Sequence, residues 1–132
     1  MFLGLDSSTQ SLTAVIIDPV SGAISHQESV NFGASFPEYG CPSGFIPGGE
    51  NGEVHSNPLM WLDALDMLFT RLSQAIDLRR IQMIAGSGQQ HGSVYLGADF
   101  EPAVANLDPT RSLSSQLSPT LTRGASPIWM DT

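Results

Sequence analysis

Residues 2–17 read FLGLDSSTQSLTAVII, and the fold is decided by this stretch. Two apolar runs that favour strands, 2–6 and 12–17, flank a polar run over 7–10. We therefore expect two strands joined by a tight turn, with Asp6 ending the first. A carboxylate there can hold Mg²⁺ or its bound waters, and such a turn can direct N–H groups and hydroxyls at phosphate oxygens. On this segment alone, the simpler interpretation is an ordinary hairpin whose polar side chains only hydrogen-bond within the turn.

Beyond the hairpin, the pattern predicts a third strand over 23–31 and a long helix that begins at Asn57. Asparagine is a good helix cap, and Pro58 suits the first helical position because no backbone hydrogen bond is lost there. Trp61 lies off the main apolar stripe of this helix, and we expect it to pack on the preceding loop. The stripe that we expect the helix to bury is Leu59, Leu62, Leu65, Phe69, Leu72 and Ile76.

Residues 33–57 are rich in glycine and proline, which predicts an irregular loop that is functional or mobile. Further along the chain we expect a strand over 81–85, a strand over 93–96, a short helix over 112–117 and a final strand over 127–130. Three strands, a helix and another strand are typical of an α/β or mixed-sheet domain.

Composition and charge narrow the class of protein. A chain of 132 residues supports one domain, and its formal net charge of −8 argues against nucleic acid or an anionic membrane as a partner. The single cysteine, Cys41, rules out an intrachain disulfide and fits a reducing cytoplasm. The sequence shows neither a membrane-spanning run nor the basic start of a signal peptide, so we expect a cytoplasmic protein.

Residues 86–92, GSGQQHG, form a second informative stretch. The glycines permit a sharp bend close to a ligand, and the side chains of Gln89, Gln90 and His91 offer donors and acceptors suited to sugar hydroxyls. The spacing fits neither a dinucleotide-binding glycine motif nor a P-loop, and a lone histidine makes a poor metal site. In isolation, a histidine in such a turn is more often structural.

Together with two further stretches, these motifs resemble the opening part of the FGGY carbohydrate kinases, and among them the xylulokinases. The matching stretches are GLDSSTQS at 4–11, LMWLDALD at 59–66, GQQHGS at 88–93 and PIWMD at 127–131. The first stretch alone would indicate only the wider actin-like ATPase superfamily. The Gln-Gln-His-Gly turn narrows the resemblance to the xylulokinases.

The resemblance implies an α/β fold of the ribonuclease-H-like (actin-like ATPase) type, with a mixed sheet, flanking helices and an incomplete first lobe. It implies ATP and Mg²⁺ as cofactors, with Asp6 placing Mg²⁺ near the γ-phosphate. By the same likeness, Ser8 and Thr9 line the phosphate turn, and Gln90 and His91 hydrogen-bond the sugar.

Three more residues are possible members of the site, without an assigned role: Gln10, Gln89 and Asp131. The family's reaction transfers the γ-phosphoryl group of ATP to the 5-hydroxyl of D-xylulose and gives D-xylulose 5-phosphate. The resemblance covers nearly all of 1–132 but only the N-terminal portion of the family's first domain. The general base and most of the adenosine pocket lie beyond it, so we expect this chain alone to be inactive.

Two alternatives stay open from the sequence. The chain is either part of a kinase for another sugar of this family, such as ribulose, gluconate or glycerol, or a non-catalytic fold fragment. Such a fragment would bind sugar weakly or self-associate, for example as a homodimer, through uncovered sheet edges.

Overall fold

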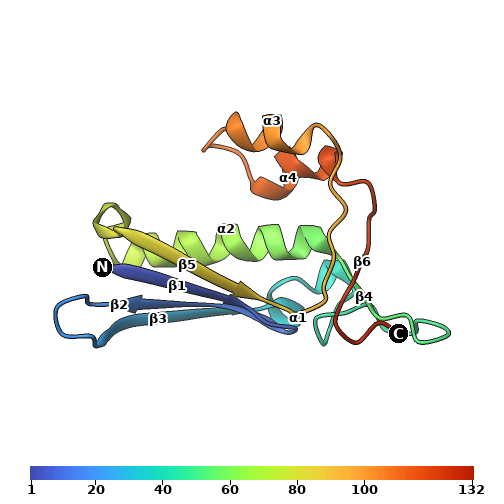
Figure 1. The fold of residues 1–132 in the computed structure, drawn as a ribbon, viewed down its shortest axis with the longest axis horizontal. Coiled ribbons are helices and arrows are strands. Elements are labelled where there is room, and N and C mark those ends of the chain that lie inside the picture. The colour runs from blue at the N-terminus through green and yellow to red at the C-terminus, as the bar shows by residue number, and fades with distance from the viewer.

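The computed structural model describes residues 1–132 and contains a four-stranded mixed sheet with a long helix packed on one face (Figure 1). The sheet strands, in the spatial order β3-β2-β1-β5, are β3 (Ile24–Asn31), β2 (Ser11–Ile17), β1 (Phe2–Ser7) and β5 (Met83–Gly88). β1 and β2 form the antiparallel hairpin that the sequence predicts, and β3 extends it antiparallel to β2. β5 joins the other side of β1 in parallel, because the chain first passes through helix α2 (Pro58–Ala75).

The other elements are short. They are α1 (Phe32–Ser35), η1 (Pro37–Tyr39), β4 (His55–Ser56), η2 (Leu78–Arg80), α3 (Phe100–Ala105), α4 (Leu113–Leu117), η3 (Ser118–Thr120) and β6 (Ser126–Pro127). α3 and α4 lie above α2 on the side away from the sheet (Figure 1). β4 and β6 pair antiparallel in a separate two-stranded sheet, which brings the end of the chain back to the loop before α2.

Helix α2 begins as the sequence predicts but turns a different face to the sheet. The Asn57 side chain accepts a hydrogen bond of 3.0 Å from the Leu59 backbone N–H, and Pro58 opens the helix. The expected stripe is only partly confirmed: Leu72 is fully buried, whereas Leu65, Phe69 and Ile76 pack against the core but are only partly buried. The side chains of α2 that are fully buried in the core are Met60, Ala64, Leu68 and Leu72.

The reason for this error is that α2 has apolar contacts on two sides. Trp61 and Leu62 line a second, apolar groove together with Val94, Leu96 and Phe100 from the segment that follows β5. Trp61 packs against the core and also faces this later segment, which the sequence did not predict. A hydrophobic pattern along one helix cannot distinguish a side that faces a sheet from a side that faces another segment.

We expect Leu68→Ala to destabilise the protein by about 2–5 kcal/mol, because it empties a fully buried core position. Leu59→Ala is the matched control, since it removes the same atoms from the same helix at a residue outside the core cluster. Urea unfolding of the two variants measures the difference. A cost for Leu59→Ala equal to or larger than that for Leu68→Ala would contradict the burial of α2 described above.

The glycine- and proline-rich loop over 33–57 is largely irregular, as the sequence predicts, but it is tied closely to the body. Phe36 and Cys41 are buried in the core cluster. The Tyr39 hydroxyl donates a hydrogen bond to the carboxylate of Asp63 on α2. The pKa of Tyr39 is raised well above its ordinary value. Burial is the largest cause, and the hydrogen bond to Asp63 is the second. This loop is therefore a packed part of the fold.

Two of the later predictions are wrong in extent. The strand predicted over 81–85 is β5, which begins at Met83 and continues to Gly88, so that residues 86–88 belong to the strand and not to the bend. No strand forms over 93–96, where a single bridge joins Leu96 to Leu121. The chain leaves the sheet after β5, and residues 93–96 do not join any of its four strands.

The end of the chain differs from prediction in the same way. The final strand is only Ser126–Pro127, rather than 127–130, because its partner β4 is itself two residues long. The helix predicted near 112–117 is confirmed as α4, with the Ser112 side chain as its cap. Helix α3, by contrast, was not predicted.

Strand β5 is one of the two edge strands of the sheet, and all of its residues are exposed. Met83 is 65 % exposed and Ile84 is 60 % exposed. This uncovered edge is the feature behind the predicted self-association, which stays a prediction. None of the helices combines the length and the apolar character that a membrane crossing requires.

Candidate functional site

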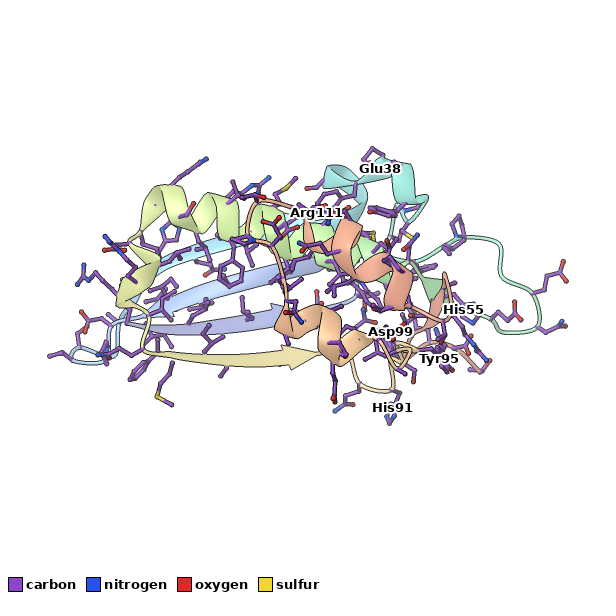
Figure 2. All side chains as sticks on the ribbon, turned by 90° about the horizontal axis from the view of Figure 1, so that it is seen from above. Glu38, His55, His91, Tyr95, Asp99 and Arg111 are labelled. Carbon is purple, nitrogen blue, oxygen red and sulfur yellow. The ribbon has the colours of Figure 1, made fainter.

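The parallel pairing of β1 with β5 brings the two informative stretches of the sequence together. Asp6 lies opposite Ser87 and Ser7 lies opposite Gly88 in the register of the two strands. Because both strands run in the same direction, the polar residues that follow them emerge at the same end of the sheet, where the C-terminal ends of β1 and β5 lie. In Figure 2, His91 lies just beyond the tip of β5, near the end of the molecule that also carries His55.

An open cavity of about 340 Å³ lies at this end of the sheet. Its lining comes from the β1–β2 turn, from the bend after β5 and from the end of the chain: Asp6, Ser7, Ser8, Thr9, Gly88, Gln89, Gln90, His91 and Trp129. Of the residues predicted for the site, the structure therefore brings together Asp6, Ser8, Thr9, Gln90 and His91. It also includes Gln89, one of the three possible members.

Asp6 is exposed and is the only carboxylate that lines the cavity. The Ser87 hydroxyl donates a hydrogen bond of 2.5 Å to Asp6 Oδ1. A carboxylate has two oxygens that accept hydrogen bonds or bind a cation, so this contact fixes one oxygen and leaves Oδ2 for a ligand. Ser87 was part of the sequence motif but was not predicted to orient Asp6.

Within the turn, the Ser8 hydroxyl is used by the turn itself. It donates to the Ser11 carbonyl oxygen at 3.1 Å and lies 3.2 Å from the Ser11 hydroxyl, while the Ser8 N–H donates to the same carbonyl at 2.9 Å. The backbone N–H groups of Thr9 and Gln10, by contrast, donate to no acceptor within the chain. Gln10 does not line the cavity, and its backbone carbonyl oxygen accepts a hydrogen bond of 2.9 Å from the Phe32 N–H. The polar groups left for an anion are thus Thr9, the Ser7 hydroxyl and the backbone of the turn.

The bend after β5 presents its side chains to solvent. Gln90 and His91 are exposed, whereas Gln89 turns back and donates from Nε2 to the Ser8 carbonyl oxygen at 3.2 Å. His91 adopts a φ of +59°, a left-handed conformation that non-glycine residues rarely take.

For two residues near the end of the chain, Trp129 and Asp131, the structure differs from what the sequence predicts. Trp129 lines the cavity, and its Nε1–H donates a hydrogen bond of 2.9 Å to the Thr9 hydroxyl. The motif over 127–131 was quoted for the resemblance, but no local signal showed that Trp129 would reach a turn 120 residues away. Asp131 does not line the cavity. Its Oδ1 accepts from the Val54 N–H at 2.7 Å and lies 3.4 Å from His55 Nε2.

The loop before α2 supports the turn from behind. Gly44 has a φ of +85°, and a Cβ built on it would lie 1.8 Å from the Thr9 carbonyl oxygen. The buried Ser56 hydroxyl fixes this glycine by donating to its carbonyl oxygen at 2.8 Å. Only a residue without a side chain allows the loop to approach Thr9 so closely.

The charges around the cavity suit a ligand that arrives with its own cation. All five basic residues of the chain are arginines, and none lines the cavity. No group of three or more His, Cys, Asp or Glu side chains is placed to hold a metal ion. Mg²⁺ is usually bound through one or two carboxylates together with waters and substrate phosphates. A single exposed carboxylate beside a polar turn fits that pattern.

The chain was compared with known proteins. No protein-family model matches it. The sequence is 40% identical to xylulose kinase 2 of Arabidopsis thaliana over 99% of this chain and 24% of that protein. It is 43% identical to the xylulose kinase of Schizosaccharomyces pombe over 99% of this chain and 23% of that protein.

The fold is also found among solved structures. The ligand-bound xylulose kinase from Lactobacillus acidophilus matches with a TM-score of 0.63 and 22% identity, over 98% of this chain and 20% of that one. The chain thus spans about a quarter of the length of the curated relatives that it matches. Sequence and fold agree: the sequence is similar to one segment of these xylulose kinases, and the chain shares the fold of the corresponding part of the solved sugar kinase.

Proposed function

We propose that this chain forms the phosphate- and sugar-binding edge of an ATP-dependent kinase that converts D-xylulose to D-xylulose 5-phosphate. The observation that carries the proposal is the shared cavity: an acidic turn suited to phosphate and a bend rich in amide and imidazole groups both line it. The relatives named as xylulose kinases support the choice of sugar. We place the protein in the cytoplasm, where these substrates would be phosphorylated.

The proposed roles follow from the contacts. Asp6 holds Mg²⁺ or its waters through Oδ2, while Ser87 fixes Oδ1. Thr9 and the free N–H groups of the turn bind phosphate oxygens, whereas Ser8 shapes the turn more than it binds ligand. Gln90 and His91 bind the sugar hydroxyls. Bound Mg²⁺ would supply the charge neutralisation that phosphoryl transfer requires and that no arginine provides here.

Asp6 cannot also take the proton of the attacking hydroxyl if it holds the cation, and no second carboxylate lines the cavity. We propose that the general base comes from the remainder of the kinase, since this chain covers about a quarter of its relatives. The proposal is tested on the full-length protein, meaning the natural polypeptide that carries these residues. We expect ADP formation that depends on D-xylulose and exceeds that with ribulose, gluconate or glycerol. An absence of sugar-dependent ADP formation would contradict the kinase, and a preference for another of these sugars would contradict the substrate.

We expect His91→Ala in the full-length protein to raise the KM for D-xylulose roughly tenfold or more, with a smaller effect on the KM for ATP, because a lost hydrogen bond to the sugar weakens ground-state binding. His91→Gly is the control, since glycine adopts a φ of +59° without strain and also lacks the imidazole. Steady-state kinetics of both variants separate the loss of the imidazole, which both variants share, from backbone strain at this position, which only alanine introduces. If either variant kept the wild-type sugar KM, the imidazole would have only a structural role.

A further inference from the structure

Trp129 is the only apolar residue that lines the cavity, and the structure gives its indole one specific partner. Nε1–H donates to the Thr9 hydroxyl at 2.9 Å, although the two residues are 120 positions apart. Trp129 is 54 % exposed, so burial of the ring does not account for its place in the fold. The contact itself is therefore the feature to explain.

The segment that carries Trp129 is fixed on both sides. Ile128 is buried, and its N–H donates to the Val54 carbonyl oxygen at 3.1 Å. The Val54 N–H donates in turn to Asp131 Oδ1 at 2.7 Å, and the Asp131 N–H donates to the Ile128 carbonyl oxygen at 2.9 Å. These three bonds hold the backbone around Trp129 against the loop before β4. Asp131 therefore has a structural role, and it lies two residues along the chain from Trp129, which lines the cavity.

The chemistry of the two groups fixes the direction of the hydrogen bond. An indole N–H can only donate, whereas a threonine hydroxyl has one proton and two lone pairs. Thr9 Oγ1 therefore accepts from Trp129, and its own proton must point elsewhere. No hydrogen bond within the chain uses that proton. The Thr9 hydroxyl is thus presented to the cavity as a donor, which is the polarity that a phosphate oxygen needs.

We propose that Trp129 is a positioning residue for the phosphate turn: it holds the Thr9 hydroxyl as an acceptor so that the hydroxyl proton is directed at a phosphate oxygen of ATP. This inference rests on the proposed function, because it assumes that phosphate binds at the turn. Under this proposal, Trp129 strengthens phosphate binding by orienting the Thr9 hydroxyl, and it does not act through packing alone.

The first test is a measurement of the contact itself, which requires no activity. In a ¹H–¹⁵N spectrum of the full-length protein, Trp129→Phe and Trp61→Phe identify the indole signals of the two tryptophans of this chain. We expect Thr9→Val to shift the signal of Trp129 and to leave the signal of Trp61 in place. An unchanged Trp129 signal would overturn the inference, whatever the protein's activity.

The second test is a double-mutant cycle on ATP affinity in the full-length protein, measured by calorimetry. We expect Trp129→Phe and Thr9→Val each to weaken binding of MgATP roughly two- to tenfold, the range for one hydrogen bond. We expect the double variant to be no weaker than Thr9→Val alone, because Trp129 then has no hydroxyl to orient. Additive losses, an unchanged affinity in Trp129→Phe, or no MgATP binding by the wild type would overturn the inference. A protein that binds MgATP with this cycle but phosphorylates no sugar would contradict only the proposed function.

Discussion

Asp6→Asn should lower kcat of the full-length protein by about a hundredfold or more, with a smaller change in the KM for sugar. Asparagine keeps the shape of the side chain and an oxygen that can accept from Ser87, so the turn should stay in place. The substitution removes the negative charge that we propose to position Mg²⁺ at the phosphates. Loss of one such electrostatic contact typically costs about two orders of magnitude or more in rate. Initial rates at saturating ATP and D-xylulose measure the effect.

Asp99→Asn is the matched control for this experiment. Asp99 is an exposed carboxylate before α3, it makes no side-chain capping bond and it lies outside the cavity. We expect it to leave kcat within about twofold of the wild type, since surface changes of this kind have small effects. Thermal unfolding should show similar stability for both variants. A kcat of Asp6→Asn as high as that of Asp99→Asn would remove Asp6 from the reaction.

Gly44→Ala should be the most damaging single-methyl change near the site. Alanine at a φ of +85° costs about 1–2 kcal/mol, and its Cβ would lie 1.8 Å from the Thr9 carbonyl oxygen. Because the neighbour is backbone, relief requires the turn or the loop to move, which adds about 1–3 kcal/mol. We expect a loss of about 2–5 kcal/mol in urea unfolding, together with weaker MgATP binding through displacement of Thr9.

Gly48→Ala separates the cost of backbone strain from the cost of the steric clash with Thr9. Gly48 has nearly the same backbone angle, with a φ of +84°, but nothing lies within 4 Å of the Cβ that it would carry. It should therefore show the cost of the left-handed conformation alone, about 1–2 kcal/mol, and leave MgATP binding unchanged. Equal effects of the two substitutions on both stability and MgATP binding would show that the loop does not support the turn.

The parts of this protein that the sequence predicts well are those with strong local patterns. The hairpin around Asp6 follows from two apolar runs, the second of them rich in β-branched residues, and a polar turn, and the start of α2 follows from Asn57 and Pro58. The meeting of the turn with the bend at His91 could be anticipated from the family resemblance. In the structure it follows from the parallel register of β1 with β5.

The parts that could not be predicted depend on contacts between distant segments. The buried face of α2 is chosen by two neighbours, the sheet and the segment that includes Val94, and the helix sequence suits both. The approach of Gly44 to Thr9 and the bond from Trp129 to the same residue join positions far apart in the chain. No local spacing encodes such contacts, so the turn was predicted without the groups that hold it.

The most direct test of the central claim is a crystal structure of the full-length protein with D-xylulose and a non-hydrolysable ATP analogue. We predict that Gln90 and His91 lie within hydrogen-bond distance of the sugar. We also predict that the γ-phosphate faces Thr9 and the β1–β2 turn, with Asp6 toward its cation. A structure with the sugar or the phosphates bound away from the cavity between this turn and the bend after β5 would contradict the account.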